Sequence, residues 1–316
     1  MNEKLKSLLW RCTKGLKIRL QYAGTKRKRE SVTNVMDSLQ TVEYIKKNRC
    51  SVARFGDGEF QMIEHGRKNG LASDFRVDSF QPFNKVLSER LDEVLRQPVD
   101  RLLVCVPYPY LHSNVYRGYD RTFIEREWLG RGELISEAFA SHAVVGDASF
   151  TRFYLHRTDI KDYPSYVAAL RGLWEKREVV VVEGEKSRLG VGNDLFDNVA
   201  SLKRILCPST DAFSVYDDIL ENVKTIGAKD KLFLLALGHT ATVLAYDMAR
   251  EGFQAIDLGH VDIEYEWYRM GAKEKCPVPG KYVNEVKAGR WVGDSQNQEY
   301  ENQIQVRIKA YNEDDD

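Results

Sequence analysis

The segment that decides the fold is VVVVEGEKSRLGVGNDL, residues 179–195. Its four valines, at 179–182, make the most strand-like run in the chain. An unbroken apolar run of this kind suits a strand that is buried on both faces. A loop with three glycines follows, and Asn193 or Asp194 can then cap a helix. A strand, a glycine-rich loop and a helix start together form the repeating unit of α/β folds.

The same pattern recurs along the chain, where short apolar runs are separated by amphipathic stretches of helical length. We predict strands at 51–55, 101–106, 143–145, 179–182, 205–207, 232–237 and 255–258, and helices at 35–47, 83–95, 166–174, 216–223 and 240–250. Strands that alternate with helices imply right-handed crossovers, so we expect a mainly parallel sheet with helices on both faces. In such sheets ligands bind where the strands end.

The composition is that of an ordinary soluble globular protein. The 316 residues are 43% hydrophobic and 30% charged, and 47 Lys and Arg balance 47 Asp and Glu. This excludes disorder, a collagen and a disulfide scaffold, and the zero net charge gives no argument for nucleic-acid binding. No apolar run approaches the roughly 18 residues that a membrane span needs. The five cysteines lie far apart without a Cys-x-x-Cys, which predicts reduced thiols in a cytosolic protein and no zinc site.

The first 30 residues carry ten Lys or Arg and two acids, a local charge of +8. An apolar stripe runs through them at steps of three and four: Leu5, Leu8, Leu9, Cys12, Leu16 and Leu20. Such a helix can lie on an anionic membrane surface, with Trp10 near the headgroups. The alternative is a solvated helix that packs on the domain. The stripe is too broken by charge for a secretory signal.

We therefore divide the chain into three parts. Residues 1–31 form a basic amphipathic extension, 32–270 a catalytic domain and 271–316 an irregular appendage, in which the strand and helix pattern fades. The expected location is the cytoplasm, with peripheral contact at the inner face of the cell membrane as a further possibility.

Two carboxylates follow the first predicted strand, in the stretch Phe55-Gly56-Asp57-Gly58-Glu59-Phe60. In an extended backbone positions i and i+2 point to the same side, so Asp57 and Glu59 would offer oxygens to one Mg²⁺ or Mn²⁺. The glycines beside and between them let the chain turn and a ligand approach closely. The competing interpretation is a helix start, with Asp57 as the cap and Glu59 in the first turn.

Two further strand ends suit phosphate groups. In the loop after 179–182, backbone N–H groups can bind a phosphate, Arg188 can add a charge-assisted pair of bonds, and Asn193 and Asp194 can bond a base or ribose. After 232–237, Gly238 and the natural cap Thr240 can cradle a second phosphate. For both, the alternative is a plain loop with a capped helix.

A fourth strand end, after 255–258, is rich in ionisable groups. Five occur within ten residues: Asp257, His260, Asp262, Glu264 and Glu266. So many carboxylates repel one another unless a cation or a proton offsets them, so we expect a general base or a metal ligand here. The aromatic rings of Tyr265, Trp267 and Tyr268 suit sugar stacking. The alternative is an exposed amphipathic strand or a helix start.

Taken together and in this order, these motifs resemble the GT-D type glycosyltransferases, a bacterial family first known as a domain of unknown function. Residues 57–59 resemble its Asp-x-Glu motif, and the likeness continues through 185–195, 236–242 and 259–267. It covers about 33–270. His239 stands where the family has proline, so the turn is retained but the histidine side chain inherits no role.

The resemblance implies a Rossmann-like fold, a UDP-sugar donor such as UDP-glucose, and Mn²⁺ or Mg²⁺. Asp57 and Glu59 would hold the metal against the diphosphate. The donor would also be contacted by Arg54, Gly56, Gly58, Arg188, Asn193, Asp194, Gly238 and Thr240. An acid of the last motif would be the base, Glu266 first, then Glu264 and Asp262, with His260 orienting or helping.

The acceptor would be a hydroxyl of a glycan or of a lipid-linked oligosaccharide, and the Tyr- and Arg-rich stretch 108–128 is the expected acceptor side. One base implies a single displacement, hence inversion. Two other classes compete: another Rossmann-like nucleotide- or cofactor-binding enzyme, such as a methyltransferase, and a non-catalytic scaffold at the membrane surface. Neither would need Asp57 and Glu59 as metal ligands.

Overall fold

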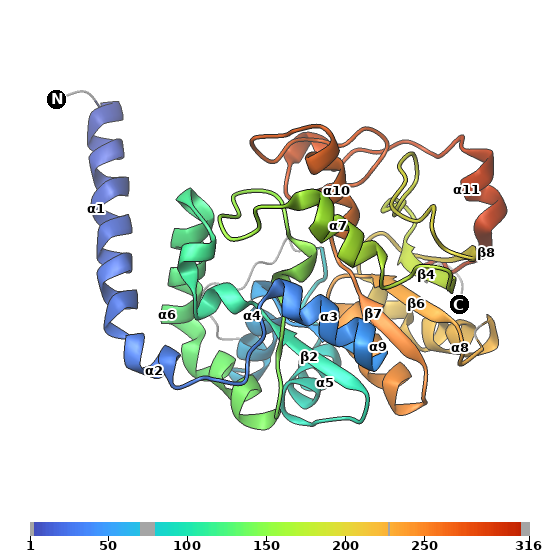
Figure 1. The fold of residues 1–316 in the computed structure, drawn as a ribbon, viewed down its shortest axis with the longest axis horizontal. Coiled ribbons are helices and arrows are strands. Elements are labelled where there is room, and N and C mark those ends of the chain that lie inside the picture. Colours follow the sequence, from blue (N-terminus) through green and yellow to red (C-terminus); the bar gives the residue numbers. More distant parts are fainter. Residues whose placement is uncertain (1–2, 70–79, 227, 311–316) are drawn as a thin grey trace.

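An eight-stranded parallel sheet forms the centre of the molecule (Figure 1). The computed structural model describes residues 3–69, 80–226 and 228–310, with side chains from Lys14 onward. The strands are β1 (Ser51–Arg54), β2 (Leu102–Val106), β3 (Gly146–Asp147), β4 (Glu178–Gly184), β5 (Ser201–Cys207), β6 (Leu232–Ala236), β7 (Gln254–Asp257) and β8 (Ile304–Arg307). Their order across the sheet is β3-β2-β1-β7-β6-β4-β5-β8, and all neighbours pair in parallel. The predicted α/β fold is confirmed.

Helices cover both faces of the sheet. The α-helices of the described residues are α1 (Glu3–Gly24), α2 (Lys26–Glu30), α3 (Ser38–Asn48), α4 (Asp57–Arg67), α5 (Lys85–Arg96), α6 (Gly118–Ser141), α7 (Tyr163–Arg171), α8 (Tyr216–Ile226), α9 (His239–Arg250), α10 (Val261–Arg269) and α11 (Gln298–Gln303). On one face α4, α5, α6, α8 and α9 pack with Val180 and Val182; on the other, α3, α7 and α10 pack with Val179 and Val181. The valine run at 179–182 is therefore buried on both sides, as predicted.

Some predicted elements are wrong or shifted. The strand expected at 143–145 is instead β3, at Gly146–Asp147, and Val145 makes only an isolated bridge to Val35. The stretch 108–128 is not loop throughout, because α6 begins at Gly118. The tail is not irregular throughout either: α11 and β8 form there, and β8 pairs with β5 at the edge of the sheet. The boundaries at 31 and 270 stay predictions.

Helix α1 stands at the side of the molecule with its N-terminal end pointing away from the sheet (Figure 1). Its C-terminal end is anchored, since the Tyr22 hydroxyl donates to the carbonyl of Tyr110 at 2.9 Å and α1 packs against α6. Leu16 and Leu20, the described part of the apolar stripe, are 60% and 66% exposed. The other stripe residues and Trp10 lie outside the described side chains. None of the helices that the structure describes is both long and apolar enough to cross a bilayer.

Candidate functional site

The predicted motifs meet at one edge of the sheet. Strands β1, β7, β6 and β4 are consecutive in the sheet and parallel, so their carboxyl ends lie side by side. Helices α4, α10 and α9 begin directly after β1, β7 and β6. Their N-terminal N–H groups therefore point toward this edge, which is the arrangement that binds anionic ligands in open α/β sheets.

Arg54, at the end of β1, fastens this edge together. Its guanidinium donates to the carbonyl of Ala148 at 3.0 Å and to Asp257 Oδ1 at 3.1 Å. Burial raises the pKa of Asp257 to about 6, against the lowering effect of Arg54. Gly259 is required beside this pair, because its φ of +48° is left-handed and a Cβ there would overlap with the Arg54 guanidinium. The Arg54 guanidinium, which was predicted to contact the sugar donor, is thus already bonded to protein groups.

Asp57 and Glu59 lie in the first turn of α4, and the predicted extended backbone is wrong. The helix begins after Gly56, whose N–H donates to Glu59 Oε2 at 2.7 Å, so Glu59 helps to cap the helix. Positions i and i+2 of a helix do not share a face. The other Glu59 oxygen, Oε1, lies 3.9 Å from Nε2 of His239. No described residue forms a hydrogen bond or ion pair with the half-buried Asp57 carboxylate.

The two carboxylates suit a hard divalent cation in their chemistry, although they do not form a complete cage. Both carboxylates offer oxygen ligands. Neither the Asp57 carboxylate nor Glu59 Oε1 accepts a hydrogen bond from a described residue. No cluster of three or more metal-ligating side chains occurs in the ranges that the structure describes. Mg²⁺ or Mn²⁺ held here would need its remaining ligands from a diphosphate and water, which is how such ions usually bind.

The turn after β6 leaves little space for a side chain. Gly238 has a φ of +54°, and a Cβ at this position would come within 2.8 Å of the Phe80 ring. Gly238 precedes α9, and Thr240 is buried inside its first turn, so the prediction of Thr240 as the helix cap is wrong. Gly58 is also needed, because a Cβ there would lie 2.5 Å from Nε2 of His239. The glycine turns of β1 and β6 therefore approach each other closely.

Beside this edge lies a second group of polar and charged side chains, which we call the α10 cluster: Asn193, Asp262, Glu266 and Lys281. The Asn193 amide donates to Asp262 Oδ1 at 2.7 Å and to Glu266 Oε1 at 2.6 Å. Lys281 Nζ lies 2.6 Å from Asp262 Oδ2 and 3.3 Å from Glu266 Oε1. Both cationic and amide partners thus offset the repulsion expected between the acids.

The other predicted site residues face elsewhere. Glu264 Oε2 accepts from the backbone N–H groups of Tyr154 and Leu155, at 3.1 and 3.2 Å. Asp194 pairs with Arg171 at 3.0 Å and accepts from the Tyr265 hydroxyl at 2.7 Å. These bonds do not favour the predicted role of Glu264 as a base or of Asp194 as a contact to the nucleotide sugar.

Two further predicted site residues, His260 and Arg188, are also engaged by surrounding protein groups. Burial lowers the pKa of His260 to about 4, and the positive charge of Arg152 acts in the same direction. Arg188 donates to the carbonyls of Gly280 and Gly293 at 2.9 and 2.5 Å. Its guanidinium therefore fastens the C-terminal segment rather than reaching into open solvent.

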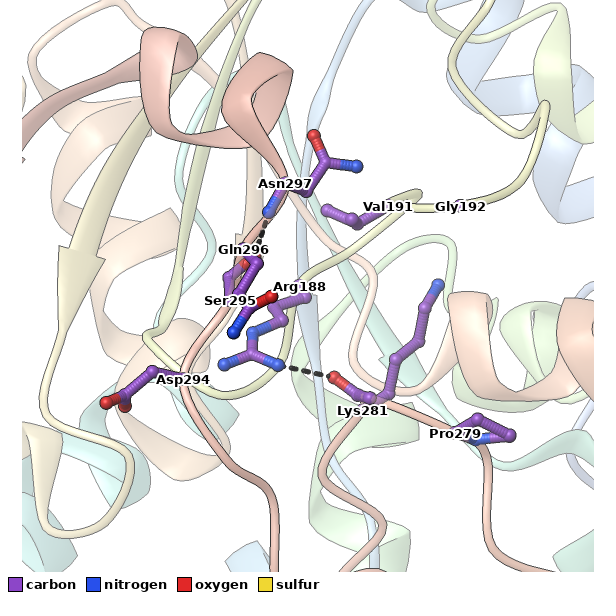
Figure 2. Close-up of a pocket in the computed structure, with 10 residues that line it drawn as sticks. Arg188, Val191, Gly192, Pro279, Lys281, Asp294, Ser295, Gln296 and Asn297 are labelled. Atoms are coloured by element: carbon purple, nitrogen blue, oxygen red, sulfur yellow. Dashed lines mark hydrogen bonds between the residues drawn. The ribbon is translucent and has the colours of Figure 1, made fainter.

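A cavity of about 540 Å³ lies between the loop after β4 and the C-terminal segment. Figure 2 shows Val191, Gly192 and Pro279 on the right and Asp294 on the left, with Arg188 in the centre beside Ser295 and Gln296. We call it the C-terminal cavity. Lys281 belongs both to this cavity and to the α10 cluster, so the two adjoin.

Sequence reasoning missed two residues of this region. Asp257 stands in the acid-rich motif but was given no role, and its proximity to Arg54 depends on the pairing of β1 with β7. Lys281 lies beyond the predicted domain boundary, in a segment without strand or helix pattern. Its charge among neighbouring prolines and glycine is unremarkable in sequence, so only the fold could place it beside Asp262.

A parallel sheet whose carboxyl edge carries glycine turns and helix N-termini defines the class of open α/β proteins that bind ligands at that edge. Within that class the chain belongs to the family described as Glycosyltransferase GT-D fold, whose model matches residues 52–286. This confirms the resemblance read from the motifs.

Individual relatives agree with this assignment. The chain is 34% identical over 92% of its length to "Probable glycosyl transferase Gly" of Streptococcus gordonii, and 31% identical over 85% to "Glycosyltransferase GlyD" of Streptococcus pneumoniae serotype 4. It spans 41% and 32% of those two relatives. A solved structure described as "The highly conserved domain of unknown function 1792 has a distinct glycosyltransferase fold" superposes with a TM-score of 0.81 at 37% identity, over 91% of this chain and 99% of that one.

Proposed function

We propose that this protein is a metal-dependent glycosyltransferase that moves a hexose, with glucose the first candidate, from a UDP-sugar to a hydroxyl of a glycan or lipid-linked oligosaccharide. The observation that carries the proposal is the GT-D fold with Asp57 and Glu59 at the strand-end edge, where α4, α9 and α10 begin. Family membership disfavours the methyltransferase and scaffold alternatives.

The carboxyl edge of the sheet would contribute to transfer by stabilising negative charge. As the bond between the sugar and the diphosphate breaks, negative charge builds on the leaving diphosphate, and a bound Mn²⁺ or Mg²⁺ supplies a positive charge to offset it. Asp57 and Glu59 would hold that ion. The backbone N–H groups at the start of α9, after Gly238, point toward the same edge and would stabilise the same charge.

The acceptor hydroxyl must lose a proton as it attacks, and Glu266 is the best placed of the three predicted bases. Both oxygens of Asp262 are hydrogen-bonded, to Gly190, Asn193 and Lys281. Glu264 is held by backbone N–H groups and turned away. Glu266 Oε1 is hydrogen-bonded, whereas Oε2 forms no hydrogen bond with a described residue and lies 3.6 Å from Arg269, so it can accept a proton.

The test is thermal shift with UDP, with and without Mn²⁺, followed by hydrolysis of a panel of UDP-sugars in Mn²⁺. We expect UDP and Mn²⁺ together to raise the melting temperature, and Asp57→Asn or Glu59→Gln to abolish the rise. Glu59→Gln is a matched variant, because glutamine retains the cap to Gly56 and loses only the charge. Stabilisation by UDP without metal, or by S-adenosylmethionine instead, would refute the proposal.

We further propose a cytoplasmic location with α1 resting on the inner face of the cell membrane. Lys17, Lys26 and Arg27 are exposed on α1 and α2, together with Leu16 and Leu20. Cationic side chains beside exposed leucines suit an anionic lipid surface.

A further inference from the structure

The C-terminal cavity is an open pocket, lined mainly by polar residues, with the volume of a small-molecule site. Its volume of about 540 Å³ lies within the roughly 300–1,000 Å³ typical of such sites. The outer wall supplies hydrogen-bonding groups, from Ser295, Gln296 and Asn297. These uncharged hydroxyl and amide groups suit the hydroxyls of a saccharide.

The cavity is lined by charges of both signs, from Arg188, Lys281 and Asp294. Both terminal nitrogens of Arg188 donate to backbone carbonyls, and Lys281 is paired with Asp262 and Glu266. Asp294 adds a negative charge to the wall. Arg188 keeps its positive charge, because its partners are neutral carbonyls, but Asp294 in the same wall opposes it and two acids neutralise Lys281. The lining residues therefore concentrate no positive charge for a diphosphate, and the cavity favours a neutral, polyhydroxylated ligand.

The cavity also adjoins the proposed base. Lys281 lines it while its Nζ lies 3.3 Å from Glu266 Oε1. A hydroxyl bound on the Lys281 side would therefore lie near the carboxylate that must remove its proton, as general-base catalysis requires. Trp291, two residues from the carbonyl that Arg188 binds, is 89% exposed and can stack on a further sugar ring.

We propose that the C-terminal cavity is the acceptor subsite and binds a neutral saccharide, in place of the predicted acceptor side at 108–128. The subsite role rests on the proposed glycosyl transfer, whereas saccharide binding can be measured without it.

The experiment compares Ser295→Phe, which fills the cavity, with Ser31→Phe on the exposed start of the domain. Among the described residues the Ser295 hydroxyl accepts from the Asn297 N–H, at 3.2 Å, and Ser295 is half-buried whereas Ser31 is exposed; since neither lies in the core, both variants should fold. Saturation-transfer NMR with neutral mono- and disaccharide methyl glycosides should show binding to the wild type and Ser31→Phe, and at least five-fold less to Ser295→Phe. Melting temperatures check the fold of each variant.

If a UDP-sugar is hydrolysed, Ser295→Phe should leave that hydrolysis unchanged and raise the acceptor KM at least ten-fold. The acceptor proposal is overturned if no glycoside binds, if Ser295→Phe binds them normally, or if UDP displaces them. Failure of the proposed function looks different, because glycosides would still bind in the cavity while no UDP-sugar is turned over.

Discussion

Glu266 is the residue on which the proposed chemistry depends most. Glu266→Gln can keep the bond from Asn193 through its amide oxygen, while it removes the ability to take a proton and the negative charge facing Lys281. We expect kcat for transfer to fall about 10²- to 10⁴-fold, the usual contribution of a general base, while the thermal shift with UDP and Mn²⁺ is retained. The exposed Glu274→Gln is the control. Full transfer activity in Glu266→Gln would remove this residue from the mechanism.

His260 makes stability depend on pH in a defined direction. Its folded pKa of about 4 lies below its unfolded value of 6.5, so the unfolded chain binds more protons between these two values. The free energy of unfolding should therefore fall as pH drops from about 6.5 to 4, by roughly 1–3 kcal/mol from this group. Urea unfolding at pH 7 and pH 5 measures the loss.

The matched variant His260→Gln should show a smaller loss of stability between the two pH values than the wild type does. An unchanged difference would mean that His260 is not desolvated in the folded protein.

The sequence predicts which acids stand near the site but not which of them face it. The alternation at 260–266 leaves a strand and a helix start both open, and in a strand Asp262, Glu264 and Glu266 would share one side. In α10, Asp262 and Glu266 are four residues apart and share a face, whereas Glu264 points to the backbone of 154–155. The same difference between strand and helix separates Asp57 from Glu59.

At the scale of elements, α1 gives a test that is independent of catalysis. Leu16→Glu with Leu20→Glu replaces two exposed apolar side chains with charges of the wrong sign for an anionic lipid surface. We expect co-flotation with phosphatidylserine-containing vesicles to fall at least five-fold, and to fall also at high salt for the wild type. Leu39→Glu on α3, which is 46% exposed, is the control. Equal flotation of all three proteins would argue against membrane contact through α1.

Elements with a clear apolar period could be predicted, whereas others, such as α6 and β8, could not. Helix α6 turns polar side chains inward, where Glu127 pairs with Arg131 at 2.6 Å and Arg131 with Glu64 at 2.8 Å. These buried pairs interrupt the apolar stripe by which a helix is recognised. Strand β8 is a short edge strand, and its partner β5 lies about 100 residues earlier, so neither length nor neighbouring sequence indicates it.

For the whole molecule, the C-terminal residues should be needed for stability. Tyr300 is buried against Arg204, and Gln303 accepts a bond from that arginine at 2.7 Å. Truncation after residue 297 removes both, together with β8, and leaves β5 as an open edge. We expect the melting temperature to fall by about 5–10 °C, with increased light scattering on heating. Truncation after residue 310 is the control, and equal melting of the two truncated chains would contradict the role of β8.

The position of Lys281 has a consequence for synthesis on the ribosome. A nascent chain that has emerged only to residue 278 already contains Asp262 and Glu266, the two acids that Lys281 neutralises. It lacks their counter-ion, the outer wall of the C-terminal cavity and the last strand of the sheet. The two carboxylates therefore acquire the Lys281 ammonium, and the cavity its outer wall, only after the strands and helices before residue 278 can already form.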